Sequence, residues 1–118
     1  MLARTEADLE ETARLSGRDD AVIVQCDVGK RAELGAAMSR AVEKLGRVDA
    51  LVNNAGLAPL AAFETFGDEA IEEVLAVNLT AAAVASRAVW PVMQKQGGGV
   101  IVNIGSIAGI DPFEGLAV

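Results

Sequence analysis

Short apolar runs alternate along the chain with longer amphipathic segments. The apolar runs, rich in β-branched residues as buried parallel strands are, comprise residues 21–26, 48–52 and 100–104. The amphipathic segments, in which apolar residues recur every three or four positions as in helices, comprise residues 5–16, 31–45 and 68–96. Strands and helices that alternate at these lengths form βαβ units. The pattern therefore predicts one α/β domain over residues 1–118, a parallel sheet with helices on both faces in a three-layer α/β/α arrangement.

The ends of the helical segments carry familiar signals. Gly17 and Gly46 follow the first two segments, and glycine commonly ends a helix. Pro91 lies inside the third segment and predicts a kink, because proline lacks the amide N–H that a helix uses. Residues 1–4 resemble a strand end that leads into the first helix. The chain is therefore expected to begin within the fold.

Composition narrows the classes of function. The chain has 118 residues, enough for one small domain, and 52% of them are hydrophobic, which suits a packed core. It carries 10 basic and 17 acidic residues, for a net charge of −7. Contacts to nucleic-acid phosphates or anionic lipid need Lys and Arg, so we expect neither nucleic acid nor a membrane as a partner.

The numbers of cysteine and histidine residues bear on location and on metal binding. Cys26 is the single cysteine, so no disulfide forms within the chain, and a reducing, cytoplasmic location is the default expectation. The chain has no His, which removes His-based metal sites and a His general base, and we expect no metal. No uninterrupted apolar run reaches the ~20 residues that span a bilayer.

Polar residues follow two of the predicted strands. Asn53-Asn54-Ala55-Gly56 comes directly after Val52, and Ser106 ends the sequence Asn103-Ile104-Gly105-Ser106 after another strand. In a parallel α/β sheet the carboxyl ends of the strands are where ligands bind. The alternatives are an ordinary Asn-Gly-type turn for the first motif and a turn former or helix cap for Ser106.

Asn78 is a third unusual position. It lies within the apolar face of the long predicted helix, where Asn is unfavourable. A functional role is one explanation. The other is a buried polar group whose hydrogen bonds are satisfied by the backbone.

Taken in order, the motifs resemble those of the short-chain dehydrogenase/reductase family, of the classical type. The resemblance runs from Leu2 to Val118. It rests on Cys26-Asp27-Val28, Asn53-Asn54-Ala55-Gly56, Val77-Asn78-Leu79 and Val102-Asn103-Ile104-Gly105-Ser106, each after the expected strand or within the expected helix. The resemblance implies a Rossmann-like sheet and a dinucleotide cofactor. It also implies reversible reduction of a ketone or oxidation of a secondary alcohol, as in the 3-oxoacyl thioester reductases.

The resemblance also implies roles for single residues. Asp27 would contact the adenine amino group, with Val28 beside the ring. Asn54, Ala55 and Gly56 would meet the adenosine ribose. Asn78 would perturb the long helix and hold a water in a proton relay, and Ser106 would donate a hydrogen bond to the substrate oxygen. A donor placed where negative charge develops favours the transition state.

Arg4 bears on the choice of cofactor. It follows the expected second strand of the family, near the adenosine 2′ position, and Ala3 stands where NAD-preferring relatives usually carry an acid. Guanidinium groups attract phosphate, often in bidentate fashion. We therefore expect NADP, with NAD possible. The alternative is a solvated Arg at a helix start.

The sequence departs from the family at both ends. The family's Gly-rich phosphate-binding fingerprint and its Tyr-x-x-x-Lys are absent from the 118 residues, which contain no Tyr. The Tyr would fall 13 residues after Ser106, one place beyond Val118. We therefore expect an internal fragment, inactive by itself, that lacks the first strand and the C-terminal part of the sheet. It should be marginally stable or should close the gap by pairing its strands differently.

Two readings of function follow. The first is a fragment of an NAD(P)-dependent oxidoreductase that acts on a small carbonyl or alcohol and is a homo-oligomer when complete. Val84, Ala88, Trp90 and Val92 on the long helix would pack against a second copy, and the alternative is that they cover the sheet. The second reading is a non-catalytic, truncated dinucleotide-binding or scaffold module.

Overall fold

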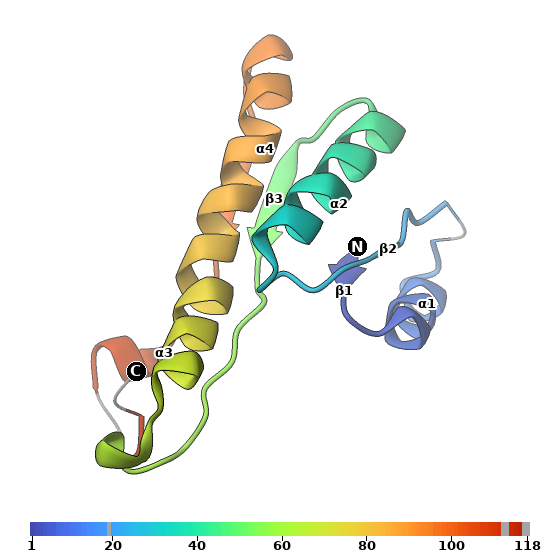
Figure 1. The fold of residues 1–118 in the computed structure, drawn as a ribbon. Coiled ribbons are helices and arrows are strands. Elements are labelled where there is room, and N and C mark those ends of the chain that lie inside the picture. The colour runs from blue at the N-terminus through green and yellow to red at the C-terminus, as the bar shows by residue number, and fades with distance from the viewer. Residues whose placement is uncertain (19, 112–113, 117–118) are drawn as a thin grey trace.

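The computed structural model describes residues 1–18, 20–111 and 114–116. Strands and helices alternate along them as the sequence pattern predicts (Figure 1). The elements are β1 (Leu2–Ala3), α1 (Glu6–Leu15), β2 (Val24–Gln25), α2 (Arg31–Leu45), β3 (Ala50–Asn53), α3 (Asp68–Leu75), α4 (Ala81–Lys95) and β4 (Val100–Asn103). Short 3-10 turns occupy Phe63–Thr65 and Ile107–Gly109, and a π-helical turn, Ala76–Thr80, joins α3 to α4.

The helix boundaries agree closely with the sequence. α2 spans the predicted residues 31–45, and Gly46 ends it in the left-handed region, at φ 69°. Glycine adopts that conformation without the steric penalty of a Cβ atom. α1 lies within the predicted 5–16, with Thr5 and Ser16 flanking it. Pro91 lies inside α4, which continues to Lys95.

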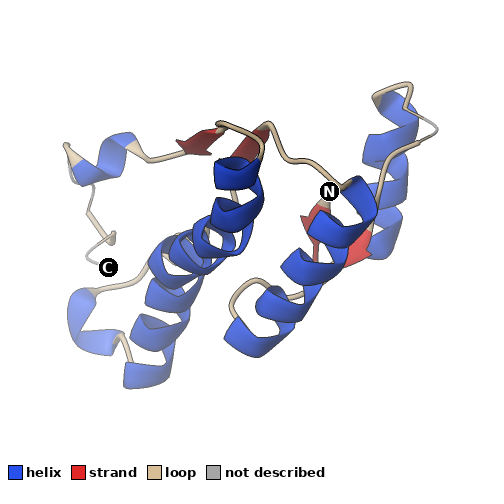
Figure 2. Ribbon diagram, turned by 90° about the horizontal axis from the view of Figure 1, so that it is seen from above, coloured by secondary structure: helices blue, strands red, loops and turns tan. Residues whose placement is uncertain are grey.

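The strands are shorter and form two separate pairs. β1 pairs with β2 and β3 pairs with β4, both in parallel, and in the described part of the chain no strand joins the two pairs. Figure 2 shows the pairs as distinct groups of arrows. The predicted 21–26 strand shrinks to two residues because β1, its one partner, supplies only two. The strands do not pair differently to close the gap, and marginal stability, the other outcome expected, stays a prediction.

The three layers are complete only around the first pair. α1 and α2 lie on either side of β1 and β2 (Figures 1 and 2). α4 packs against one face of β3. On the other face of that pair, Val52, Val100 and Val102 are 57%, 58% and 39% exposed. The α/β class with parallel strands is therefore confirmed, and the sheet, which was predicted to be incomplete, is present as two pieces.

The main core lies between α2 and α4, the most extensively packed pair of helices. Leu34, Met38, Ala85 and Val89 are each at most 5% exposed there. Leu45, Leu75 and Leu79, apolar residues of the predicted amphipathic segments, are 52%, 49% and 65% exposed, whereas Val84, predicted to pack against a second copy, is buried at 6%. The cause on the long helix is the π-helical turn. It takes one residue more than an α-helical turn, so α3 and α4 do not share one continuous stripe.

By length and composition alone, the continuous helical stretch Asp68–Lys95 could cross a membrane, with a mean hydropathy of 1.3 in its most apolar window. The stretch is not an uninterrupted apolar run, because polar residues such as Asn78 and Ser86 lie within it. Length and composition do not separate a spanning helix from a core helix. Here Val84, Ala85, Val89 and Met93 of this helix belong to the core that packs on α2.

Candidate functional site

One cavity gathers seven of the eight predicted site positions. It has a volume of about 670 Å³ and lies between the two strand pairs, bordered by α2 and α4. The predicted positions that line it are Arg4, Asp27, Val28, Asn54, Ala55, Gly56 and Asn78. They come from four separate segments of the chain, between residues 4 and 78. A cavity of this size falls in the range of small-molecule and cofactor sites.

Asp27 begins the turn between β2 and α2. One carboxylate oxygen, Oδ1, accepts a hydrogen bond from the N–H of Gly29 at 3.0 Å, and the Asp27 N–H donates to Glu33 Oε1 at 2.8 Å. These bonds fix the carboxylate at the carboxyl end of β2. A Cβ atom on Gly29 would come within 3.1 Å of Val77 Cγ2, so this turn packs closely on the helix of Asn78. Asp27 thus has a second carboxylate oxygen for a ligand.

Asn78 uses its whole side-chain amide on one residue. Its Oδ1 accepts from the Leu57 N–H at 2.9 Å, and its Nδ2 donates to the Leu57 carbonyl at 2.8 Å. The side chain therefore takes the place of a strand partner for the segment after Gly56. The alternative explanation was a buried Asn78 whose hydrogen bonds are satisfied by the backbone. Its hydrogen bonds do go to backbone groups, but Asn78 is exposed rather than buried.

The backbone at Asn78 is the π-helical turn Ala76–Thr80. A π-helical turn leaves the regular i→i−4 ladder and is frequent at functional sites. The long helix is thus perturbed where the resemblance implied that it would be. The role of Asn78 toward a water molecule stays a prediction.

Asn53, the first residue of the motif Asn53-Asn54-Ala55-Gly56, also contributes to the site, although the sequence indicated no separate role for it. Its Nδ2 donates to Asn103 Oδ1 at 2.8 Å and to Ser86 Oγ at 3.3 Å. The register of β3 and β4 places Asn53 directly opposite Asn103. Both strands end in Asn, and that shared ending was the signal that could have predicted the pair. The pair ties the carboxyl ends of β3 and β4 together, and both residues line the cavity.

Ser106 lies apart from the other seven. It is not among the residues that line the cavity. Its hydroxyl accepts from the Ala108 N–H at 3.1 Å and caps the 3-10 turn Ile107–Gly109. Its geometry here is that of the helix cap considered as the alternative, and its side chain is exposed.

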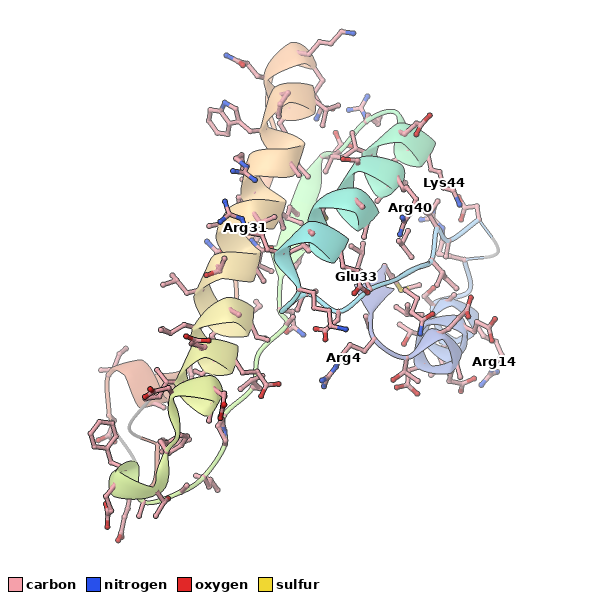
Figure 3. All side chains as sticks on the ribbon, viewed as in Figure 1. Arg4, Arg14, Arg31, Glu33, Arg40 and Lys44 are labelled. Atoms are coloured by element: carbon pink, nitrogen blue, oxygen red, sulfur yellow. The ribbon has the colours of Figure 1, made fainter. Side chains whose placement is uncertain are left out.

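Arg4 is positioned by β1 and by Gln25. Gln25 Nε2 donates to the Arg4 carbonyl at 2.8 Å, which holds the backbone at the end of β1. The Arg4 side chain is exposed and extends away from the ribbon (Figure 3). A cationic group thus stands at the cavity rim with freedom to meet an anion.

Cys26 forms part of the cavity wall. It is fully buried, and burial raises the pKa of its thiol, with further increases from the negative charges of Glu33 and Asp27 and an opposing effect of Arg40. A thiol with a raised pKa is a weak nucleophile at neutral pH. Among the described residues, no group of three or more His, Cys, Asp or Glu side chains is placed to hold a metal ion.

The polar and apolar groups that line the cavity suit the adenosine part of a dinucleotide. A carboxylate and an asparagine amide can bond amino and hydroxyl groups. Val28 offers an apolar surface, and Arg4 offers a cation for phosphate. Gly56 lies beside Asn78, since a Cβ atom there would be in ordinary van der Waals contact with Asn78 Oδ1, at 3.6 Å.

Comparison with known proteins bears on this geometry. The family model described as short chain dehydrogenase matches residues 1–118. A 2-(R)-hydroxypropyl-CoM dehydrogenase of Xanthobacter autotrophicus is 39% identical over 113 residues, which cover 91% of this chain and 45% of that protein. An uncharacterised oxidoreductase of Bacillus subtilis, YxjF, is 38% identical over 96 residues, 81% of this chain and 37% of that protein.

Solved structures give the same picture. The 3-ketoacyl-(acyl-carrier-protein) reductase of Brucella melitensis complexed with NADH superposes with a TM-score of 0.87 at 31% identity, over 98% of this chain and 50% of that chain. A putative short-chain alcohol dehydrogenase of Sinorhizobium meliloti superposes with a TM-score of 0.90 at 29% identity, over 98% and 47%. The chain thus spans half or less of the length of these relatives.

Proposed function

Because the chain belongs to the short-chain dehydrogenase family, we propose that the protein is an NAD(P)-dependent oxidoreductase that reduces a ketone or oxidises a secondary alcohol. One observation carries the proposal. Seven positions predicted for cofactor and substrate chemistry, far apart in the sequence, line a single cavity at the carboxyl ends of parallel strands.

The described residues fit the adenosine half of the cofactor. Asp27 keeps one carboxylate oxygen beyond its bond to Gly29 and would accept from the adenine amino group, with Val28 against the ring. Asn54, Ala55 and Gly56 would meet the ribose. When bound, the nicotinamide group supplies or accepts the hydride.

Arg4 supports a preference for NADP. Its exposed guanidinium stands at the cavity rim beside the carboxyl end of β1, and the adjacent Ala3 brings no carboxylate to repel a phosphate. The 2′-phosphate would gain a charge-assisted bidentate contact there. NAD would lose that contact and would still meet Asp27 and the Asn54 turn.

Two further residues would serve the substrate. Ser106 would turn its hydroxyl from the Ala108 N–H to the substrate oxygen, and Asn78 would steady a water near it. A 3-oxoacyl thioester is the proposed substrate class. Its support is the similarity to the Brucella melitensis reductase, whose name gives a 3-ketoacyl substrate.

The proposal extends to setting and assembly. The net charge of −7 and the single, buried Cys26 support a cytoplasmic enzyme that binds neither nucleic acid nor membrane. Trp90, 61% exposed on α4, supports a homo-oligomer formed through that helix. Val84 does not contribute to such a surface, since it lies in the core.

Kinetics with the longest reading frame that contains this sequence test the function. Oxidation of NADPH and of NADH is followed with a 3-oxoacyl thioester and with a simple ketone. Arg4→Gln should raise the KM for NADPH about tenfold or more and leave that for NADH within about twofold. Arg87→Gln, an equal loss of charge at an exposed site on α4, is the control. Failure to bind either dinucleotide would overturn the proposal.

A further inference from the structure

Three hydrogen bonds hold Asp27 in place at the carboxyl end of β2. Its Oδ1 accepts from the Gly29 N–H at 3.0 Å, its carbonyl accepts from the Lys30 N–H at 3.1 Å, and its own N–H donates to Glu33 Oε1 at 2.8 Å. The first bond is an Asx turn, and the second closes a β-turn over residues 27–30, in which Asp is typical of the first position. Among the described residues, only the second carboxylate oxygen, Oδ2, has no partner. Oδ2 is therefore the group that Asp27 offers to the cavity.

The bond to Glu33 is the one that comes from outside this turn. Glu33 is the third helical residue after Lys30, the N-cap of α2. In a capping box, a glutamate at this position binds the N–H of the N-cap residue. Here the Lys30 N–H is already bound to the Asp27 carbonyl, and Glu33 reaches further back, to the Asp27 N–H. Figure 3 shows Glu33 on the side of α2 that faces β2. The side chain thus ties the helix to the residue predicted to meet the adenine.

Gly29 limits the position of the Asp27 carboxylate. A Cβ atom on Gly29 would lie 3.3 Å from Asp27 Oδ1 and 3.1 Å from Val77 Cγ2, both closer than ordinary van der Waals contact. The direction of a side chain depends on the backbone atoms on either side of its Cα. In Asp27, Glu33 holds the amide on one side and Lys30 holds the carbonyl on the other. Loss of the bond to Glu33 would therefore free one end of the residue and let Oδ2 move.

A fixed carboxylate oxygen can distinguish a donor from an acceptor on a bound base. An ionised carboxylate only accepts hydrogen bonds. The amino group of adenine donates, whereas a carbonyl at the same position, as in hypoxanthine, accepts and would be repelled. A carboxylate that is free to rotate could turn away from such a carbonyl. The discrimination therefore depends on how firmly Asp27 is held.

We propose that Glu33 is a positioning residue for the cofactor: through the Asp27 N–H it fixes Oδ2 toward the adenine amino group, and it thereby sets the preference for adenine over a base with a carbonyl there. The inference rests on the proposed function, because it takes Asp27 as the residue that meets the adenine. Glu33 is not among the residues that line the cavity, so it acts through Asp27. A role limited to capping α2 would stabilise the helix without a preference for either base.

Direct binding of reduced dinucleotides tests this role. The protein is the longest reading frame that contains this sequence, and the fluorescence of the reduced nicotinamide reports binding without a substrate. The probes are NADPH and its hypoxanthine analogue, in which a carbonyl replaces the adenine amino group. NADH and its hypoxanthine analogue replace them if the protein binds NADH more tightly. We expect the unaltered protein to bind the adenine form at least about fivefold more tightly than the analogue.

Three substitutions of Glu33 separate the hydrogen bond from the charge. Glu33→Ala removes both, and Glu33→Asp keeps the charge but is one methylene shorter and does not reach the Asp27 N–H. Both should weaken binding of the adenine form at least about fivefold and binding of the analogue less than about twofold. Glu33→Gln keeps an oxygen acceptor without the charge and should restore the affinity for the adenine form to within about twofold. Glu43→Ala, at an exposed position of the same helix, is the matched control.

Equal losses for the two probes in Glu33→Ala and Glu33→Asp would mean a purely structural role and would overturn this inference, with the proposed function intact. Glu33→Gln as weak as Glu33→Ala would also overturn it, because the charge would then decide. So would an unaltered protein that binds both probes equally. Failure to bind any dinucleotide would instead overturn the proposed function, and this inference with it. If Glu33→Ala does not fold, Glu33→Asp decides, since it keeps the negative charge that stabilises a helix N-terminus.

Discussion

The side chain of Asn78 pairs with both backbone polar groups of Leu57, accepting from its N–H at 2.9 Å and donating to its carbonyl at 2.8 Å. The two residues are 21 positions apart, and the contact joins the π-helical turn to the segment that follows the Asn54 turn. One amide thereby positions two parts of the cavity wall. The contact lies within the chain, so it can hold this part of the cavity wall in place without a bound ligand.

Asn78→Ala should lower the free energy of unfolding by about 1–3 kcal/mol, because two backbone groups lose their partner. Asn78→Asp should lower it by a similar amount, since a carboxylate keeps the bond from the Leu57 N–H but repels the Leu57 carbonyl. Urea unfolding measures the change, and amide exchange at Leu57 reports it locally. Asn54→Ala, on the same cavity wall, is the control and should change stability by less than about 0.5 kcal/mol. Unchanged exchange at Leu57 in both Asn78 variants would contradict this account.

The sequence predicted the helices and most of the candidate site because both depend on local signals. Apolar spacing and a terminal glycine defined α2, and the cavity positions were predicted from sequence motifs and from the family resemblance that those motifs carry. The gap between the strand pairs was expected, because the resemblance implied that the first strand of the sheet is missing. That the strands do not pair across it is a property of long-range pairing, which neither periodicity nor turn residues encode.

Two other differences have local physical causes. The π-helical turn at Ala76–Thr80 changes the phase of the long helix, so Leu79 is exposed and Val84 is buried. A count at 3.6 residues per turn cannot predict that change. Ser106 donates no bond to the cavity in this structure and caps a 3-10 turn, a role equally typical of Ser after a strand.

The Asn53–Asn103 pair predicts an asymmetric response to Asp. Asn53 acts as donor and Asn103 as acceptor, at 2.8 Å. Asn103→Asp keeps an acceptor opposite the Asn53 amide and should change the free energy of unfolding by less than about 1 kcal/mol. Asn53→Asp removes the donor and faces Asn103 Oδ1 with a carboxylate, so it should cost about 1–3 kcal/mol.

Urea unfolding of the two single variants measures this asymmetry, and each carries the same added charge. Equal losses would mean that charge, rather than the direction of the hydrogen bond, decides the outcome. Ser86→Ala separates the contribution of the longer bond of 3.3 Å and should cost least.

Gln96, directly after α4, bonds to the segments that precede β3 and β4. Its Oε1 accepts from the Val48 N–H at 3.2 Å, and its Nε2 donates to the carbonyls of Val48 at 2.6 Å and Gly98 at 2.8 Å. Gln96→Glu keeps the acceptor, loses both donated bonds and should destabilise by about 1–3 kcal/mol. Gln94→Glu, an equal change of charge at an exposed position of α4, should have little effect. Thermal unfolding of the two variants side by side would refute the prediction if their losses matched.

Cys26 predicts a loss of stability at alkaline pH. Burial first, and then the negative charges of Glu33 and Asp27, raise the pKa of the thiol above its ordinary value of 9.0. Between the ordinary pKa and the raised one, the unfolded chain has released this proton and the folded chain has kept it. Folding stability from this group is therefore complete below about pH 9 and declines as pH rises through that value.

Cys26→Ala removes the effect, and its stability should fall less steeply than that of the unaltered chain between about pH 8.5 and about pH 10.5, a range that begins near the ordinary pKa of the thiol. Glu33→Gln, which keeps an acceptor for the Asp27 N–H, should lower the thiol pKa, and Arg40→Gln should raise it. The pH dependence of Cys26 alkylation measures both shifts. Opposite shifts in these two variants are the expected result, because Glu33→Gln removes a negative charge that raises the thiol pKa and Arg40→Gln removes a positive charge that lowers it. Shifts of the same sign would show that the charges of Glu33 and Arg40 do not act on Cys26.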